Sequence, residues 1–559
     1  MTDKENEKKI SQLLEATKEA AEEREAERLA KSLGVQYVNL VRYAPQTQAL
    51  QLISEEEARA ALCAPFNIQQ KQVFLACKNP ALEATRNVIK SLKNQGYEVE
   101  IFVVSLKSLE TLWRGYKFIT GRKKEITGGL EIDTNRLAEL SSEIKNIAIL
   151  KEKIDNFDSP YISQIFEIII AGALTMDASD IHIEPEERGV RLRYRLDGVL
   201  QDVADLNEHY YRSILSRIKL LGGMKINIHT APQDGRFTIK TKDVEIEVRV
   251  SIIPSAYGET VVMRLLDPRR IQLDLKDLGF REDDLTIIEE QIARPNGLIL
   301  NTGPTGSGKT TTLYAFLRRI YQPGIKIITI EDPIEYHLEG ITQTQVNPTR
   351  DYTFANGLRS ILRQDPDVIL VGEIRDNETA EIAMHASLTG HLVLSTLHTN
   401  DACGTVPRLL DMKVQPAILA PALNLAIAQR LVRKLCVHCR EEVEAMPEQA
   451  DKIRKAIERM PQRVKKPQLG KRITFYKSKG CDLCNGTGYK GRVAIAELLV
   501  VDRDIQDLIN RGDRMPTANE IKDLALKKGM TTMEDDAIFK ILDGTTSLSE
   551  AENVLGKFL

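Results

Sequence analysis

The spacing of apolar residues predicts alternating helices and strands along most of the chain. Between residues 33 and 118, helical spacing marks residues 55–62 and 82–92, and short apolar runs typical of strands cover residues 73–76 and 99–103. This pattern predicts a small α/β module. No cluster of catalytic residue types stands out within it.

A second α/β region is predicted for residues 156–272. It opens with a helix over residues 159–174. Strand-like runs follow at residues 190–194, 237–239, 244–250 and 261–265.

A third region, residues 273–432, alternates apolar strands with longer helical segments. Its predicted strands are residues 297–300, 325–330, 368–371 and 392–395. Such alternation predicts a mostly parallel, doubly wound sheet, so the expected fold class is α/β. The end of the chain, residues 493–559, has the pattern of helices.

Two further segments are strongly polar. Residues 1–32 are dense in Glu, Lys and Ala and predict a charged helix with a weak apolar stripe. That helix either lies exposed to solvent or docks on a partner. Residues 119–155 predict a linker that contains some helix.

Composition restricts the choice of partners and location. The chain has 559 residues, enough for three or four domains, with a formal net charge of -3 and 5% aromatic residues. Nucleic acid is therefore not expected as a main partner. The best candidate for a membrane span, residues 417–428, is interrupted by Pro421 and Asn424, and the charged N-terminus does not resemble a signal peptide. We expect a cytoplasmic protein without direct membrane insertion.

The segment that follows the first strand of the third region has the pattern of a P-loop. It reads Gly-Pro-Thr-Gly-Ser-Gly-Lys-Thr and precedes a helical segment. Its glycines allow backbone N–H groups to turn toward phosphate oxygens, Lys309 can reach the β and γ phosphates, and Thr310 can ligate Mg²⁺. ATP and Mg²⁺ are the expected ligands. The residues expected to contact them are Gly303, Pro304, Thr305, Gly306, Ser307, Gly308, Lys309, Thr310 and Thr311.

Two carboxylates stand at the ends of strands predicted to flank the P-loop. Glu331 follows residues 325–330 and Glu373 follows residues 368–371. Ligand sites in open α/β sheets lie at the carboxyl ends of strands. We expect Glu373 to hold Mg²⁺ through water, or to orient and deprotonate the attacking water, and Glu331 to serve the same reaction. One acidic residue alone would also be typical of a helix cap.

Histidines and arginines add candidates for phosphate contact. His391 and His398 bracket residues 392–395, and His398 stands where a γ-phosphate sensor is expected. The alternative for each histidine is a hydrogen-bonded core residue. The candidate cations that would neutralise phosphoryl charge are Arg249, Arg264, Arg359 and Arg363. From spacing alone, all four could equally be surface arginines in salt bridges.

Four of the seven cysteines form two Cys-x-x-Cys pairs. Cys436 and Cys439 make the first pair, and Cys481 and Cys484 make the second. In a reducing compartment this spacing favours one tetrahedral Zn²⁺ held by four thiolates over disulfides. The alternative is four reduced, buried cysteines.

Together these motifs resemble those of the secretion and pilus traffic ATPases, in the group that includes PilB and GspE. The resemblance covers residues 156–559 and is carried by the P-loop and by residues 328–336, 361–376 and 387–400. Upstream, residues 178–184, 195–198, 232–236 and 258–267 also match.

The resemblance implies a hexameric ring on the cytoplasmic face of the inner membrane. Residues 156–272 would form a PAS-like N2 domain, and residues 273–559 a RecA-like ATPase domain that includes a zinc module over residues 433–492. Arg249 and Arg264 match the arginines that this family brings from N2 onto ATP. Arg359 and Arg363 match further nucleotide-facing arginines.

Residues 33–118 resemble the N1 domain of this family more loosely. Some relatives bind cyclic-di-GMP there through an Arg-Leu-Gly and Leu-rich motif. Ser32 stands in the place of the arginine before Leu33 and Gly34, and the Leu repeat is absent, so cyclic-di-GMP binding is not expected.

The implied function is ATP-driven assembly of a type IV pilus. The implied partners are an inner-membrane platform protein like PilC or GspF, and an adaptor like PilM or GspL that contacts N1. Type II secretion is the main alternative. Less favoured alternatives are a pilus retraction motor and a nucleotide-binding scaffold that does not hydrolyse ATP.

Overall fold

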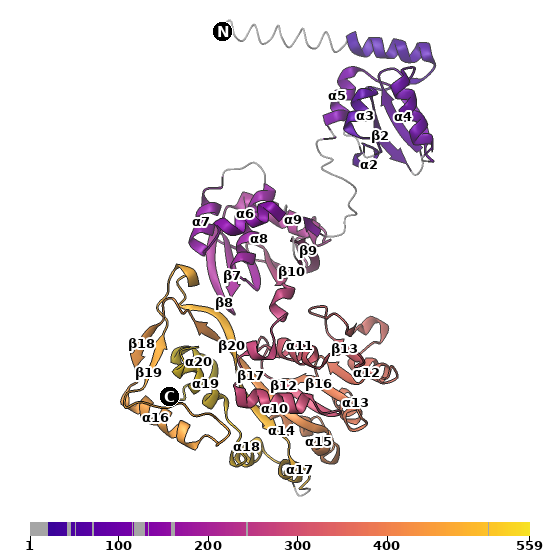
Figure 1. Ribbon diagram of the computed structural model, residues 1–559. Helices are drawn as coiled ribbons and strands as arrows, with labels where there is room; N and C mark the ends of the chain where they lie inside the picture. Colours follow the sequence, from indigo (N-terminus) through magenta and orange to yellow (C-terminus); the bar gives the residue numbers. More distant parts are fainter. Residues whose placement is uncertain are drawn as a thin grey trace. The chain divides into compact units, whose positions relative to one another are not determined.

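The computed structural model describes residues 21–41, 46–50, 52–69, 72–94, 96–114, 116, 129–131, 134–157, 162–241, 244–511 and 514–559. The chain divides into two compact units, residues 1–125 and residues 126–559. Each unit is built around its own sheets (Figure 1). Most of the helix expected over residues 1–32 lies outside the described residues, of which residues 21–33 are helical.

The first unit is a small α/β module with a four-stranded sheet in the order β1-β4-β3-β2. The strands β2 and β3 pair in antiparallel fashion, and the other neighbours pair in parallel. Ala26 and Ala30 of the N-terminal helix pack against Val103, so this helix is part of the module's core. The elements are β1 (Gln36–Tyr37), α2 (Thr47–Leu50), α3 (Glu55–Ala60), β2 (Cys63–Gln69), β3 (Gln72–Cys77), α4 (Glu83–Asn94), β4 (Glu98–Val103) and α5 (Leu106–Arg114).

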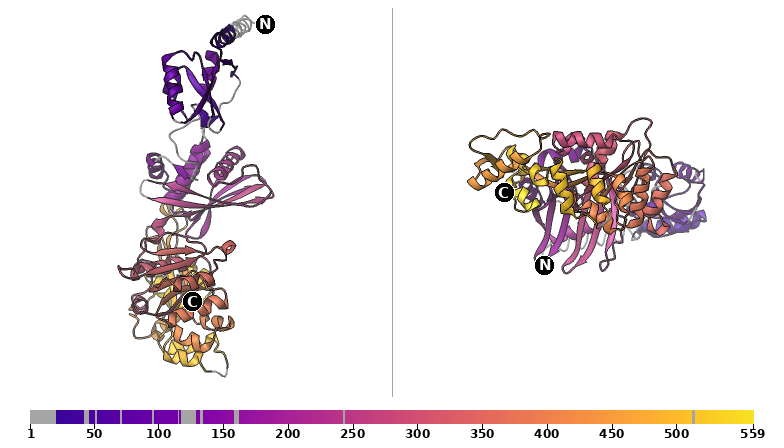
Figure 2. Two further views of the ribbon diagram at one scale, coloured as in Figure 1. Left: turned by 90° about the vertical axis from the view of Figure 1, so that its right-hand side faces the viewer. Right: turned by 90° about the horizontal axis from the view of Figure 1, so that it is seen from below.

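The second unit begins with a domain built on a seven-stranded sheet, which we call N2. Its strand order is β5-β9-β10-β11-β6-β7-β8, and only β5 and β9 pair in parallel. Four helices gather over one face of this sheet (Figure 2). The elements are β5 (Gly129–Glu131), α6 (Thr134–Glu143), α7 (Ile147–Asp155), α8 (Ile162–Thr175), β6 (Asp180–Glu186), β7 (Gly189–Leu196), β8 (Val199–Leu206), α9 (Glu208–Leu221), β9 (Gln233–Lys240), β10 (Glu245–Ser255) and β11 (Gly258–Leu266).

The start of N2 differs from the boundary expected from the sequence. The predicted linker, residues 119–155, contains α6 and α7, and the side chains of Leu140, Ile144, Leu150 and Ile154 are buried in the N2 core. Their apolar residues stand at helical spacing, and the charged residues between them favour the prediction of a linker with some helix. The sheet and core of N2 therefore also include residues 129–131 and 134–155, ahead of the predicted residues 156–272.

The ATPase domain has a seven-stranded sheet in the order β14-β13-β15-β16-β12-β17-β20. All neighbours are parallel except β17 and β20, which confirms the mostly parallel, doubly wound sheet. The central strands are buried along their whole length because helices cover both faces. The elements up to β17 are α10 (Glu282–Ile292), β12 (Gly297–Thr302), α11 (Lys309–Ile320), β13 (Ile327–Glu331), β14 (Thr342–Gln345), α12 (Phe354–Leu362), β15 (Val368–Val371), α13 (Asn377–Leu388), β16 (Leu392–Leu397), α14 (Thr405–Asp411), α15 (Pro416–Ala422) and β17 (Leu423–Leu435).

The last part of the chain leaves the sheet and returns to it. The apolar stretch at residues 417–428 divides into the end of α15 and the start of β17. An excursion after β17 carries all four paired cysteines before β20 pairs with β17. Among the described residues, no helix is both long and apolar enough to cross a membrane. The elements are β18 (Glu441–Glu444), α16 (Pro447–Arg459), β19 (Thr474–Lys477), β20 (Tyr489–Val500), α17 (Arg503–Ile509), α18 (Ala518–Lys527), α19 (Met533–Leu542) and α20 (Leu548–Leu555).

Candidate functional site

Four adjacent parallel strands bring the predicted nucleotide-binding groups to one edge of the ATPase sheet. The P-loop follows β12, His398 follows β16, Glu373 follows β15, and Glu331 is the last residue of β13. Because parallel strands share a direction, their carboxyl ends meet at the same edge. The candidate site therefore runs across four strands in the order P-loop, His398, Glu373, Glu331.

The P-loop turns directly into α11. Gly308, with φ of 89°, is the N-cap of that helix, a conformation that favours glycine. The Nζ atom of Lys309 donates hydrogen bonds to the carbonyl oxygens of Gly303 at 2.8 Å and Pro304 at 3.0 Å. Burial lowers the pKa of Lys309, the negative charge of Glu373 opposes this, and the positive charge of Arg430 adds to it. The lysine must leave these carbonyls to reach a bound phosphate.

Other groups in the P-loop are arranged to take a ligand. The hydroxyl of Ser307 is buried and has no hydrogen-bond partner in the protein, which fits a polar ligand at the loop. The start of α11 supplies free backbone N–H groups and the positive end of a helix dipole, which suit phosphate. Thr310, the second residue of α11, and Glu373 are the oxygen donors that would hold Mg²⁺.

Glu373 forms a small charged group with its neighbours. Its side chain is 15% exposed, and its carboxylate pairs with the guanidinium of Arg375 and lies 3.5 Å from Nε2 of His398. The structure thus brings His398 and Glu373 together at the edge of the sheet that carries the P-loop. The contact between Glu373 and His398 was not predictable from spacing, because these two residues follow different strands.

Glu331 is held more tightly than Glu373. It is 4% exposed and accepts hydrogen bonds from the hydroxyl of Tyr314 at 2.5 Å, the hydroxyl of Thr329 at 2.6 Å, and the amide of Gln343 at 3.1 Å. Burial and the charge of Glu331 raise the pKa of Tyr314. The sequence did not lead to a prediction for Tyr314 or Gln343. The only signal concerns Tyr314, which is an aromatic hydroxyl within an apolar helix. These three donors fix the carboxylate of Glu331 in one orientation.

Two arginines of N2 act on the loop that follows Glu331, one by direct contact and one by its charge. Arg249 donates to the carbonyl oxygen of Ile334 at 2.6 Å, and Arg264 donates through Nε to Asp180 at 2.9 Å. Burial raises the pKa of Glu335, and the positive charges of Arg249 and Arg264 oppose that rise. Both arginines therefore act electrostatically on the loop beside the candidate site. Their terminal nitrogens are the part of each side chain that could bind a phosphate.

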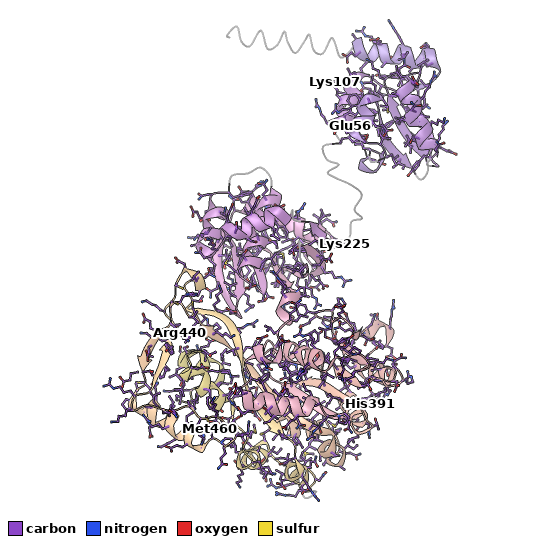
Figure 3. The ribbon with its side chains drawn as sticks, viewed as in Figure 1. Glu56, Lys107, Lys225, His391, Arg440 and Met460 are labelled. Carbon is purple, nitrogen blue, oxygen red and sulfur yellow. The ribbon has the colours of Figure 1, made fainter. Side chains whose placement is uncertain are left out.

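The other three predicted nucleotide contacts, Arg359, Arg363 and His391, have partners within their own domain. Arg359 donates to Glu378 of α13 at 2.5 Å, and Arg363 donates to the carbonyl oxygen of Arg359 at 3.1 Å. His391 precedes β16 and contacts the carbonyl oxygen of Ala386 in α13 at 3.0 Å (Figure 3).

His391 is separated from the P-loop by the full length of the sheet. The residue after it, Leu392, pairs with Gly297, which is the first residue of β12. Six strand residues span about 20 Å. His391 therefore does not line the P-loop of its own subunit, because the strand that connects it to His398 carries the two histidines to opposite edges.

One cation near the P-loop was not predicted. Arg430 of β17 donates to the carbonyl oxygen of Asn400 at 3.0 Å, in the loop after His398. Burial lowers the pKa of Arg430, and nearby Glu497 and Asp401 oppose this. Its guanidinium ties β17 to the loop that carries His398. The sequence gives no signal for it, because β17 lies in the stretch where helix and strand patterns overlap.

The four paired cysteines form a compact cluster. Their sulfur atoms all lie within 4.8 Å of one another, with separations of 3.9 Å for Cys436 and Cys481, 3.8 Å for Cys439 and Cys484, and 3.7 Å for Cys481 and Cys484. Tetrahedral Zn–S bonds of about 2.3 Å place sulfurs about 3.8 Å apart. The backbone N–H groups of Cys481 and Gly488 each donate to the sulfur of Cys484 at 3.2 Å. The four cysteines thus fit one structural Zn²⁺.

Comparison with known proteins matches these features to one family. Residues 155–553 match the family described as Type II/IV secretion system protein, and residues 33–117 match the MshEN domain. The chain belongs to the type II/IV secretion system protein family. In this family member the P-loop and the strand-end carboxylates lie at one edge of the sheet, and the cysteine cluster is a separate candidate zinc site.

Individual relatives carry two different names. The chain is 39% identical over 535 residues to the type IV pilus assembly ATPase PilB of Thermus thermophilus, which covers 94% of this chain and 56% of that relative. The chain thus spans about half the length of that relative. It is 44% identical over 427 residues to the type II secretion system protein E of Dickeya dadantii, which covers 76% of this chain and 81% of the relative.

Solved structures support the fold. The ATPase DotB of Legionella pneumophila aligns with a TM-score of 0.52 at 21% identity, over 72% of this chain and 97% of DotB. The RecA-like α/β architecture expected from the sequence is therefore confirmed.

Proposed function

We propose that the protein is a hexameric motor that hydrolyses ATP to drive assembly of a type IV pilus. The observation that carries the proposal is the P-loop edge, where Lys309, His398 and Glu373 follow adjacent strands while Arg249 of N2 contacts the neighbouring loop. An ATPase domain and a second domain that meet at the nucleotide site can convert nucleotide binding into rigid-body motion.

The chemistry follows from the groups at this edge. Lys309 leaves the carbonyls of Gly303 and Pro304 and binds the β and γ phosphates. Glu373 orients the attacking water and accepts its proton, and His398 senses the γ-phosphate from the adjacent strand. Thr310 and Glu373 would hold Mg²⁺, which would supply positive charge against the phosphates.

The N2 arginines supply the remaining positive charge. Arg249 and Arg264 exchange their present partners on the loop and on Asp180 for the phosphoryl oxygens, either within one subunit or in the neighbouring one. Glu331, fixed by its three donors, supports the same reaction from the next strand. In the hexamer, His391 would serve a neighbouring site, because it lies at the sheet edge opposite its own P-loop, whereas Arg359 and Arg363 remain candidate nucleotide contacts.

The relatives support both functions at similar identity, and the proposal of pilus assembly is supported by the larger share of the chain that its relative covers. The pilus assembly relative aligns with 94% of the chain, including the first unit, whereas the secretion relative aligns with 76% at slightly higher identity. The second candidate, an ATPase of type II secretion, is supported by that higher identity. Both functions imply an inner-membrane platform protein as partner, an adaptor on the N1 module, and a location at the cytoplasmic face of that membrane.

A gene deletion in the native bacterium separates the two functions. We expect loss of surface pili and of pilus-dependent motility, with an unchanged set of secreted proteins, and restoration by the wild-type gene but not by the Lys309→Ala gene. Normal piliation together with loss of secreted proteins would overturn the proposal in favour of type II secretion. Absence of phosphate release by the purified wild-type protein would contradict both.

A further inference from the structure

A buried glutamine lies behind the P-loop and contacts both of its ends. Strand β17 runs parallel to β12, with Ala428 opposite Thr302, the last residue of β12. Gln429 is therefore the first residue of β17 to pass beyond the end of β12. Gln429 is only 1% exposed.

One oxygen atom of this glutamine accepts two hydrogen bonds. The Oε1 atom of Gln429 accepts from Nδ2 of Asn301 at 3.1 Å and from the hydroxyl of Thr312 at 2.9 Å. Asn301 lies just before the P-loop, in β12, and Thr312 lies just after it, in the first turn of α11. The side-chain carbonyl of Gln429 thus links the segment just before the P-loop to the segment just after it.

The backbone and side chain of the same residue also press against two P-loop glycines. A Cβ atom built at Gly303 would lie 2.5 Å from the carbonyl oxygen of Gln429, and one built at Gly308 would lie 2.9 Å from its Nε2. Any side chain at either glycine would collide with Gln429. The P-loop therefore follows its path both because its glycines permit it and because the loop packs closely against Gln429.

The polar contacts would be costly to lose, because they are buried. An apolar residue of similar size would leave the Asn301 amide and the Thr312 hydroxyl without their acceptor. Asn301 already has one buried oxygen with no partner, so it has little other support. Two donors, one from each end of the P-loop, share this buried acceptor. This arrangement indicates that Gln429 fixes the geometry of the loop.

We infer that Gln429 is a positioning residue that clamps the two ends of the P-loop and so aligns its N–H groups and Lys309 for phosphate. Gln429 does not contact ATP in this assignment. It acts through Asn301 and Thr312. The inference rests on ATP hydrolysis by this site, and its structural readouts below are independent of hydrolysis.

The test compares full-length wild type with Gln429→Leu, Thr312→Val, Thr312→Ser and the Gln429→Leu/Thr312→Val double variant. Thr312→Ser keeps the hydroxyl and is the matched control for Thr312→Val. We expect the kcat for ATP to fall at least tenfold in Gln429→Leu and about threefold in Thr312→Val, and to stay within twofold of wild type in Thr312→Ser. The double variant should match Gln429→Leu, because both changes remove the same bond.

Amide hydrogen exchange without nucleotide separates the clamp from general destabilisation. In Gln429→Leu and Thr312→Val, exchange should accelerate across residues 303–312 while α13 and N2 keep wild-type rates. Two results would overturn the inference: turnover of Gln429→Leu within twofold of wild type, or exchange that accelerates evenly across the domain. If Gln429→Leu does not fold, the test uses Thr312→Val and Asn301→Ala instead. Independent and additive effects of these two changes on kcat would also overturn the inference. Failure of the wild type to hydrolyse ATP would contradict the proposed function, and the exchange pattern would still decide the clamp.

Discussion

Replacing Arg264 by alanine should slow ATP turnover without unfolding the protein. The side chain of Arg264 is 63% exposed, and within the described part of the chain its Nε donates a hydrogen bond to Asp180. Asp180 keeps other partners after the change, namely Ser179 at 2.8 Å and Arg195 at 3.4 Å. The buried carboxylate is therefore not left alone, and little stability should be lost.

The size of the effect follows from the bond that Arg264 would make to phosphate. A hydrogen bond to a charged group contributes about 1.5–3 kcal/mol. Applied to the transition state, this corresponds to a loss of about 10- to 150-fold in kcat. Phosphate release at saturating Mg-ATP measures it, together with the midpoint of thermal unfolding.

The matched control is Arg191→Ala, another N2 arginine in a surface ion pair, with Glu186 at 3.1 Å. It should leave turnover unchanged. If Arg264→Ala retains more than a third of wild-type turnover, Arg264 is an ordinary surface charge and the coupling between N2 and the ATPase domain is wrong. If turnover falls only in proportion to the loss of folded protein, the argument that Arg264 stabilises charge in the transition state is also refuted.

Four further predictions concern single features of the ATPase domain. Lys309→Ala should reduce phosphate release below a tenth of wild type with an unchanged thermal midpoint, because the lysine binds the transferring phosphate. Glu373→Gln should keep the affinity for a fluorescent ATP analogue and lower kcat, and a collapse of affinity instead would make it a binding residue. Elemental analysis should find one Zn²⁺ per chain in wild type and none in the Cys481→Ser/Cys484→Ser variant, whose thermal midpoint should also drop. Burial raises the pKa of Asp284 to about 6, so the folded state holds its proton more tightly than the unfolded state. Its contribution to stability should fall as pH rises from about 4 to about 6. The difference in thermal midpoint between wild type and Asp284→Asn should change over that range and be constant above about pH 7.

The parts of the site that the sequence predicts best are those set by strand order. The residue that ends a buried parallel strand must lie at the ligand edge of the sheet, so the places of Glu331, Glu373 and His398 follow once the strands are found. His391 shows the limit of this reasoning. A motif places both histidines within eight positions of each other, whereas the six-residue strand between them carries them to opposite edges.

Side-chain partners across the fold are not available from spacing. Arg359 and Arg363 share a helix face as expected, and only the packing of α12 against α13 shows that Glu378 holds Arg359. In the same way, the charged pattern of residues 119–155 hides the fact that α6 and α7 are buried against α8. Periodicity reports which residues can be buried together, and tertiary packing decides what covers them.

The cysteine cluster and the nucleotide site are connected by one strand, β17. This connection predicts which parts of the domain loss of Zn²⁺ affects first. Strand β17 borders the P-loop through Gln429, and the chain reaches Cys436 directly after its last residue, Leu435. The module returns through β20, whose pairing with β17 runs from Leu425 opposite Val500 to Leu435 opposite Tyr489. Loss of Zn²⁺ frees the outer end of this two-stranded ribbon first. The end that contacts the P-loop remains paired with β12 and packed in the core, so stability should fall before the geometry of the nucleotide site changes.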